Sequence, residues 1–253
     1  MTRILAIHAH PDDVEILAGG TLALLSAAGH SITIATMTAG DCGSAELSAE
    51  EISAIRIEEA RAAAKLIGAE YRCCGFADLE IFNDSASRRR VTDVLRIMRP
   101  DIVLTASPID YMADHETTSA LVKDACFGAP ASLYRTAAPA LPAIPHLYYM
   151  DPLTGCYPDG AEAIRDFFVD VSPVFLKKRA MLEQHASQRD WLRTHHGMDD
   201  YILQMETATR DAGDKFGVRY GEGFRQYRGH AYPQTPFLQD LLGDAVKTKE
   251  VSR

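Results

Sequence analysis

The segment at residues 3–15, RILAIHAHPDDVE, joins an apolar run to a turn rich in histidine and aspartate. Residues 3–7 are mostly Ile, Leu and Ala, which is typical of a strand buried on both faces of a sheet. Over residues 14–28 apolar side chains recur at helical spacing, and Gly29 offers a C-terminal stop. The segment therefore predicts a buried strand that passes through a polar turn into a helix.

The same alternation of strand and helix continues along the chain. Ser48 and Glu51 have the spacing of a capping box, and the Ala-, Glu- and Arg-rich stretch after them predicts a helix to residue 67. Further strands are expected at residues 31–37, 70–74, 101–106, 146–150 and 166–171, and further helices at residues 86–98, 116–127 and in two segments between 174 and 212. This alternation predicts an α/β fold that is Rossmann-like, with three α/β/α layers and a mostly parallel sheet.

The chain is expected to form a single domain over residues 1–242. Its 253 residues are enough for one large domain with a sizeable core. The four prolines between residues 128 and 145 indicate a surface excursion and not a domain boundary. Residues 243–253 are mainly polar, and we expect them to form a frayed tail.

The charge balance argues against nucleic acid as a partner. The chain has 26 Lys and Arg against 35 Asp and Glu, a net charge of −9, and phosphate binding needs clustered basic side chains. The tight basic run at residues 88–90 is more typical of a solvated helix start. We find no signal-peptide pattern and no apolar run long enough to cross a bilayer, so we expect a cytoplasmic protein with no membrane partner. The five cysteines lack CxxC spacing and fit reduced thiols.

His10 and Asp13 are the first candidates for a metal site. They lie three residues apart after the first strand, and ligands bind at the carboxyl ends of strands in an open α/β sheet. Histidine together with carboxylate suits Zn²⁺ or another borderline divalent ion. The alternative is that Pro11 and the acidic residues after it only stabilise a helix N-terminus.

A second histidine among acidic residues follows another predicted strand. The strand at residues 101–106 leads into residues 107–116, which contain Asp110, Asp114 and His115. Taken alone, His115 is more typical of a surface loop. Together with His10 and Asp13 it makes a set of two histidines and one aspartate, which leaves one position on a metal open for water.

Three motifs together resemble one enzyme family. They are the run from Ala9 to Asp13 (AHPDD), the pair Asp114-His115, and residues 178–188, which end in HASQ. This combination is similar to the zinc-dependent N-acetylglucosaminyl deacetylases, called PIG-L or LmbE-like. The resemblance extends from residue 3 to about residue 228.

The resemblance implies a role for each matching residue. His10, Asp13 and His115 would hold one Zn²⁺ per chain, although other divalent transition metals compete for such ligands. Asp12 would be the general base that takes a proton as a metal-activated water attacks an amide. The implied substrate is an N-acetylated or N-acylated amino sugar, such as an N-acetylglucosamine conjugate. Such relatives are often trimers or hexamers, so we expect a homo-oligomer.

Met112 departs from the family pattern. Many relatives carry a histidine at this position, three residues before the last metal ligand, where it is thought to stabilise the oxyanion. Methionine cannot donate a hydrogen bond, so His185 or Tyr111 would have to substitute. The departure keeps open a second reaction at the same site, a lyase or hydratase reaction on a small carboxylic acid.

Three further residues are candidates for binding substrate. Arg56 matches a segment where the family often places a substrate-contacting arginine, but a salt bridge with Glu59 explains it equally well. His185 would lie at the rim of the active site or at the edge of the core. Glu222 is flanked by glycines, which allow close backbone approach, and it could also be a plain turn carboxylate. Asp41 is a weaker candidate for hydroxyl binding.

Other function classes receive less support. The glycines at residues 19–20 fall inside a helix, and neither GxGxxG nor GxxxxGK[ST] is present, which disfavours nucleotide binding. A serine hydrolase is disfavoured because the chain has no GxSxG. A metal-binding module without catalysis would share the ligands but would not need Asp12.

Overall fold

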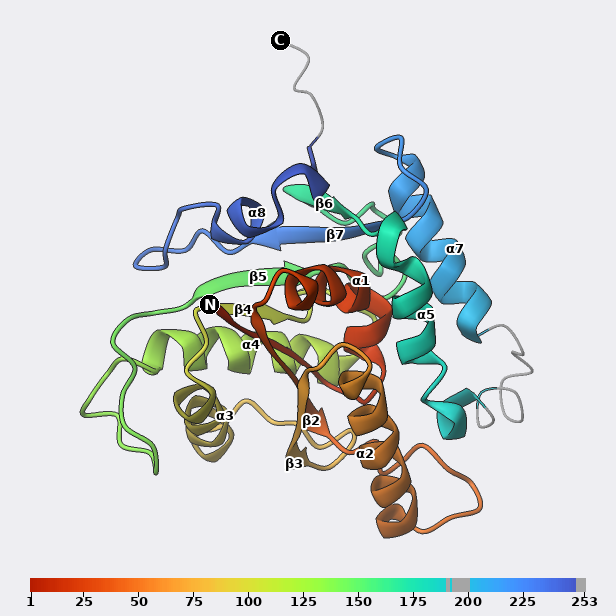
Figure 1. Ribbon diagram of the computed structural model, residues 1–253. Helices are drawn as coiled ribbons and strands as arrows, with labels where there is room; N and C mark the ends of the chain where they lie inside the picture. The colour runs from red at the N-terminus through yellow and green to blue at the C-terminus, as the bar shows by residue number, and fades with distance from the viewer. Residues whose placement is uncertain (190–191, 193–200, 249–253) are drawn as a thin grey trace.

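A single eight-stranded sheet in the order β3-β2-β1-β4-β5-β7-β6-β8 organises the protein. The computed structural model (Figure 1) describes residues 1–189, 192 and 201–248. Five strands run parallel, whereas β7 pairs antiparallel with β5 and β6, and β8 pairs antiparallel with β6. The strands are β1 (Arg3–His8), β2 (Ser31–Thr38), β3 (Glu70–Phe76), β4 (Ile102–Thr105), β5 (His146–Met150), β6 (Phe167–Asp170), β7 (Gly221–Gln226) and β8 (Val246–Lys247).

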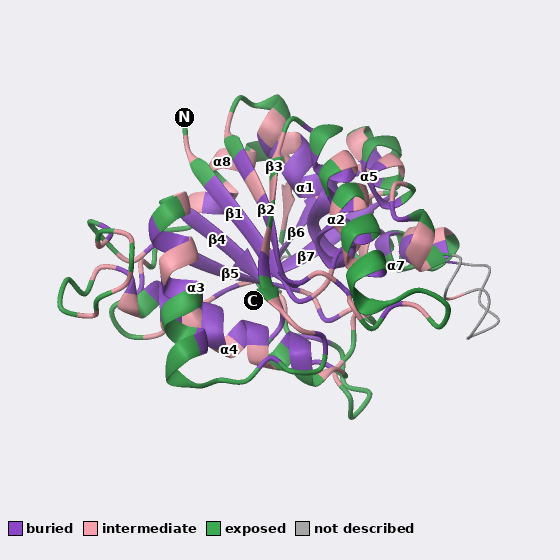
Figure 2. Cartoon of the chain, turned by 90° about the horizontal axis from the view of Figure 1, so that it is seen from below, coloured by how far each residue is buried: buried purple, intermediate pink, exposed green. Residues whose placement is uncertain are grey.

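Helices cover both faces of the sheet, as the strand sequences require. In β1, Ile4 and Ala6 pack into one core while Leu5 and Ile7 pack into the other. Helices α3 and α4 cover one face, and α1, α2 and α5 cover the other; Figure 2 shows the buried strands between these layers. The helices are α1 (Asp13–Ala27), α2 (Ala49–Lys65), α3 (Ser85–Met98), α4 (Ala113–Gly128), α5 (Phe175–Leu182), α7 (Tyr201–Asp214) and α8 (Phe237–Leu242). This single α/β domain with three layers confirms the predicted fold class.

The strand order places a binding site beside β1. From β1 the chain passes to β2 on one side, while β4 pairs with its other edge. Such a reversal of strand order opens a crevice at the carboxyl ends of the strands. The loops after β1 and β4 meet there, so the two segments that carry the candidate metal ligands come together.

The antiparallel part of the sheet is where the structure differs from the sequence analysis. No strand was expected at residues 221–226, because the glycine-rich GEGFRQ lacks the branched side chains of a typical strand. Pairing with β5 and β6 on both sides stabilises it instead. Residues 243–247, which were expected to belong to a frayed tail, instead form a 3-10 turn and strand β8, in which Val246 pairs with Val169. Among the described helices, none is long and apolar enough to cross a membrane.

A buried ion pair joins α5 to β7, and its carboxylate also binds the backbone of α1. Lys178 Nζ donates to Glu222 Oε1 at 2.6 Å, and both side chains are 1% exposed. The same carboxylate accepts from the backbone N–H groups of Gly20 at 2.9 Å and Thr21 at 2.7 Å. Helix α1 lies this close because Gly20 has no side chain: a Cβ there would be 2.6 Å from the Cβ of Val171.

We predict that Lys178→Met lowers the free energy of unfolding by about 3–5 kcal/mol, because it leaves the buried Glu222 carboxylate without its cation. Lys177→Met is the matched control on the same helix. Lys177 is exposed, so its replacement should change stability by no more than about 0.5 kcal/mol. Chemical denaturation of both variants gives the two values. Equal stabilities for the two variants would contradict a structural role for the pair.

Candidate active site

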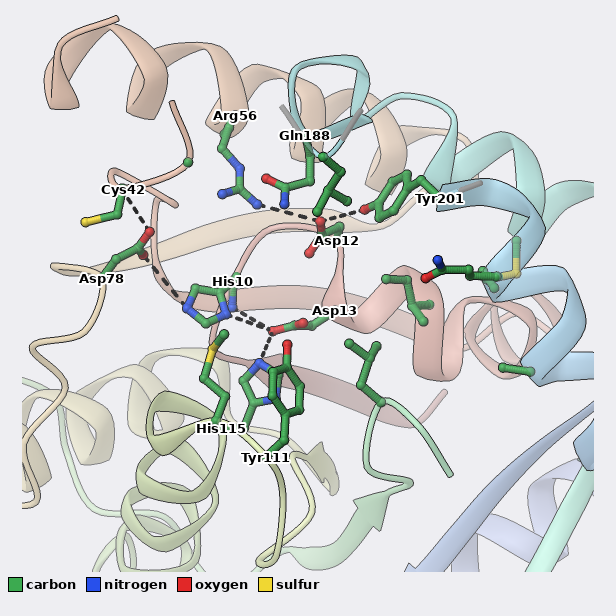
Figure 3. A pocket seen from close by; sticks show the side chains of 18 of the residues that line it. His10, Asp12, Asp13, Cys42, Arg56, Asp78, Tyr111, His115, Gln188 and Tyr201 are labelled. Atoms are coloured by element: carbon green, nitrogen blue, oxygen red, sulfur yellow. Dashed lines mark hydrogen bonds and ion pairs between the residues drawn. The ribbon is translucent and has the colours of Figure 1, made fainter. Parts of the chain in front are cut away.

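The loops after β1 and β4 line a cavity of about 510 Å³ at the carboxyl ends of the parallel strands. Figure 3 shows side chains from distant parts of the chain converging on it. Its polar lining includes His10, Asp12, Asp13, Arg56, His115 and Tyr201. The structure therefore brings the three predicted metal ligands and the predicted base into one cavity.

The backbone is strained at Asp12, and the side chains of the consecutive residues Asp12 and Asp13 lie in different surroundings. Asp12 has a φ of 103°, a left-handed conformation that is rare for residues other than glycine and costs free energy. Asp13 is the first residue of α1, so only residues 9–12 separate the end of β1 from the start of the helix. As a result, the side chain of Asp13 lies among histidines, whereas that of Asp12 lies against Arg56 and Tyr201.

The spacing of His10, Asp13 and His115 fits a tetrahedral metal ion. Asp13 Oδ2 lies 3.4 Å from His10 Nδ1 and 3.5 Å from His115 Nε2. Bonds of 2.0–2.1 Å to zinc place neighbouring ligands of a tetrahedron about 3.3–3.4 Å apart. Two edges of the set therefore have the length that zinc requires, and the set faces the cavity.

His8 is a competing candidate that the sequence analysis did not consider. Donor atoms of His8, Asp13 and His115 lie within 4.8 Å of one another and could also hold an ion. However, His8 Nδ1 is only 2.6 Å from Asp13 Oδ2, which is a hydrogen bond and is too short for two ligands of one zinc ion. His8 is also fully buried and does not line the cavity, so the geometry favours His10 as ligand and His8 as the partner that orients Asp13.

A carboxylate lies close to each candidate histidine ligand, at the ring nitrogen that is not the one facing Asp13. His10 Nε2 lies 3.3 Å from Asp114 Oδ2, and His115 Nδ1 lies 3.2 Å from Asp110 Oδ1. Carboxylates of this kind fix the orientation of a metal-binding imidazole and raise its basicity. The sequence shows these acids beside His115 but does not reveal that Asp114 reaches His10, 104 residues away.

The two neighbouring aspartates have pKa values shifted in opposite directions. Burial raises the pKa of Asp12; the Arg56 guanidinium offsets this only in part, and the charge of Asp13 adds to it. Burial acts in the same direction on Asp13, but the imidazoles of His8 and His115 outweigh it and hold its pKa well below the usual range. Such a divergence separates the roles of two carboxylates. It suits Asp13 as an anionic ligand and Asp12 as a group that takes up a proton.

Asp12 is held through one of its two carboxylate oxygens. The hydroxyl of Tyr201 donates to Asp12 Oδ2 at 2.5 Å, and Arg56 Nη2 lies 3.7 Å from the same oxygen. Burial and the charge of Asp12 raise the pKa of Tyr201 well above its usual value, so the phenol stays protonated and remains a donor. The sequence analysis missed Tyr201, because nothing in its spacing relates it to Asp12, 189 residues away.

The predicted substrate-binding residues lie in different places. Arg56 lines the cavity and donates to the carbonyl of Pro11 at 2.8 Å. His185 is buried outside the lining, with Nε2 at 3.5 Å from Glu15 Oε1. The structure does not bring Glu222 to this cavity, since its carboxylate is bound to Lys178 and α1. Tyr111 and Met112 both line the cavity. The weaker candidate Asp41 accepts from the backbone N–H of Asp78 at 2.8 Å.

The chain is similar to known deacetylases and to a hydratase. Residues 5–126 match the model of the family described as PIG-L, GlcNAc-PI de-N-acetylase. The diacetylchitobiose deacetylase of Thermococcus kodakarensis is 26% identical over 93% of this chain and 86% of its own length. The 4-oxalmesaconate hydratase of Pseudomonas putida is 29% identical over 73% of each chain. The solved structure of an N,N'-diacetylchitobiose deacetylase from Pyrococcus horikoshii, complexed with an inhibitor, superimposes with a TM-score of 0.78 at 26% identity, covering 93% of this chain and 87% of that one.

We predict that His10→Ala abolishes stoichiometric metal binding, whereas His8→Ala lowers metal affinity only by about 10- to 100-fold, the usual effect of removing a residue that orients a ligand. Elemental analysis of the purified variants and competition with a chelating dye measure both effects. The assignment is contradicted if His8→Ala loses the metal and His10→Ala keeps it.

Proposed function

We propose that the chain is a zinc-dependent hydrolase that removes an N-acetyl or other N-acyl group from an amino sugar or a small amino-sugar conjugate. The match of residues 5–126 to the PIG-L family model supports this proposal. The observation that carries the proposal is that Asp12, with its raised pKa, lines the same cavity as the set His10, Asp13 and His115. The relatives that are amino-sugar deacetylases support the reaction class.

Different residues around the cavity would carry out different steps of amide hydrolysis. A bound Zn²⁺ would supply Lewis acidity and lower the pKa of water. Asp12 Oδ2 is held by Tyr201, which leaves Oδ1 to take the proton of the attacking water. Asp12 then passes this proton to the nitrogen as the C–N bond breaks, so that the amide and water become a carboxylate and an amine. Arg56 holds the turn through Pro11 and keeps positive charge beside Asp12.

Tyr111 is the better replacement for the missing histidine at Met112. Of the two candidate donors, Tyr111 lines the cavity, with its ring 5.6 Å from that of His115, whereas His185 lies outside it. In Figure 3 the Tyr111 hydroxyl lies near Asp13. Burial and the nearby carboxylates raise the pKa of Tyr111 to about 12, so at neutral pH its hydroxyl is a neutral donor. We propose that it stabilises the oxyanion of the tetrahedral intermediate.

A hydratase that acts on a small carboxylic acid is the second candidate. Two observations favour it: the relative named 4-oxalmesaconate hydratase, and methionine at position 112. It would use the same metal ligands. The deacetylase proposal has the stronger support, because the family model and several relatives carry that activity in their names.

The proposal also covers the oligomeric state of the enzyme and its location in the cell. We propose a homo-oligomer, a trimer or hexamer, that works in the cytoplasm on a small-molecule substrate. This part rests on the family resemblance and on the acidic charge balance, which disfavours nucleic acid.

We predict that Asp12→Asn lowers kcat for acetate release from N-acetylglucosamine conjugates by about 10²- to 10⁴-fold, because an amide cannot take the proton of water. The variant should keep its metal, since Asp12 is not among the ligands. A coupled acetate assay and elemental analysis provide the two readouts. Full turnover by Asp12→Asn would rule out its role, and stoichiometric metal without acetate release from any N-acyl sugar would favour the hydratase.

We predict that Tyr111→Phe lowers kcat by about 10²-fold, as expected for removal of an oxyanion donor, with little change in KM. Tyr157→Phe is a suitable control, because Tyr157 lies outside the cavity lining. Steady-state kinetics on one substrate compares the variants. A Tyr111→Phe enzyme with normal kcat would show that another group acts as the donor.

A further inference from the structure

One wall of the cavity is apolar and leads away from Asp12. Tyr201, Met205 and Ala208 have helical i, i+4, i+7 spacing, so they lie on one face of α7. Ile16, one turn after Asp13 on α1, and Leu153, after β5, add to the wall. From Tyr201 to Ala208 the helix rises by about 10 Å. The wall therefore begins at the residue that holds Asp12 and extends well beyond the reach of an acetyl methyl group.

The opposite wall is polar and has buried atoms that lack a hydrogen bond within the described residues, although Asp78 Oδ1 lies 3.9 Å from His10 Nε2. Asp78 Oδ1, Gln188 Oε1 and Arg56 Nε are buried and make no hydrogen bond to the part of the chain that the structure describes. Figure 3 shows these three side chains around Asp12 and His10. A buried polar atom without a hydrogen bond is unfavourable, so a ligand that supplies the missing bond is favoured there. Gln188 is fixed in place because Ser187 donates twice to the Glu59 carboxylate, at 2.9 and 2.6 Å. This wall suits a hydroxylated group.

The apolar wall also adjoins a second hollow of about 800 Å³. The cavity and this hollow share Ile16, Leu153, Gln204 and Ala208. Ile16 and Leu153 pack on the main core, so the wall is firmly supported. A group that follows this wall removes apolar surface from water as far as Ala208, where the second hollow begins, which is lined also by charged side chains such as Asp211 and Lys215.

From these two unlike walls we infer that the substrate is amphiphilic. Its hydroxylated part binds the polar wall, and an apolar chain longer than an acetyl methyl lies along Ile16, Met205 and Ala208. The inference rests on the proposed function, because it describes the substrate of that reaction. The chain is carried either on the acyl group or on the sugar as an alkyl glycoside, and both place the same chemistry against the wall.

The test compares four substrates: N-acetylglucosamine, N-hexanoylglucosamine, and the methyl and hexyl glycosides of N-acetylglucosamine. Each fully buried methylene contributes about 0.8 kcal/mol, a factor of about four. The wall is open on one side, so we expect kcat/KM to rise at least about tenfold in one of the two series, and that series identifies which position carries the chain. If N-acetylglucosamine is hydrolysed and neither series gains, the inference is wrong and the proposed function stands.

A binding measurement separates the two proposals if no amide is hydrolysed. Calorimetric titration of Asp12→Asn protein with the same four compounds reports affinity without turnover. A gain of at least about tenfold with chain length would support the apolar wall even when the proposed reaction fails. Equal affinity across both series would overturn it.

Ala208→Phe tests the wall itself. The exposed Ala208 faces the junction of the two hollows, and a phenyl group there would block it. We expect the ratio of kcat/KM, or of affinity, between the hexyl-bearing and short substrates to fall toward one. The control is Asp214→Phe, at the exposed end of the same helix and outside both linings, which should keep the ratio. An unchanged ratio in Ala208→Phe would contradict the inference.

Discussion

A single carboxylate oxygen, Oδ2 of Asp13, is the point on which the site depends. It lies 2.6 Å from His8 Nδ1, 3.4 Å from His10 Nδ1 and 3.5 Å from His115 Nε2, and it accepts the backbone N–H of His10 at 2.8 Å. Three imidazoles, two from the end of β1 and the turn after it and one from the start of α4, thus converge on one buried anion. A metal ion bound here would balance that charge and satisfy the facing nitrogens, and the strand order of the sheet brings these residues together.

The turn that places Asp13 also gives Asp12 a different environment. Asp12 takes a strained backbone conformation, and its side chain lies beside Arg56 and Tyr201 instead of the histidines. Arg56 can approach because Gly40 makes room for it: Gly40 has a φ of +75°, and a Cβ there would lie 2.1 Å from Arg56 Nη1. Two consecutive carboxylates therefore differ in pKa because their neighbours differ. Under the proposed function, the strain at Asp12 lets adjacent residues take the separate roles of ligand and base.

The site residues that could be predicted from the sequence are those that lie in short recognisable segments. The AHPDD motif and the acids around His115 each follow a recognisable strand, and parallel strands bring their carboxyl ends together. Tyr201 and Gln188 could not be found this way, because their positions depend on how later helices pack against α1 and α2. Glu222 was a candidate for binding substrate, but the structure places its carboxylate against α1. The local sequence could not distinguish the two, because a carboxylate between glycines looks the same whether it faces a ligand or the backbone of α1. The antiparallel strand that carries it is likewise stabilised by its neighbours and not by its own sequence.

The most direct test of this account is a crystal structure of the zinc-loaded protein with anomalous scattering recorded at the zinc edge. The account predicts one ion per chain, bound by His10 Nδ1, an oxygen of Asp13 and His115 Nε2 at about 2.0–2.2 Å, with an open position toward Asp12. An ion bound by His8 in place of His10, or an anomalous peak elsewhere with none at Asp13, would contradict it.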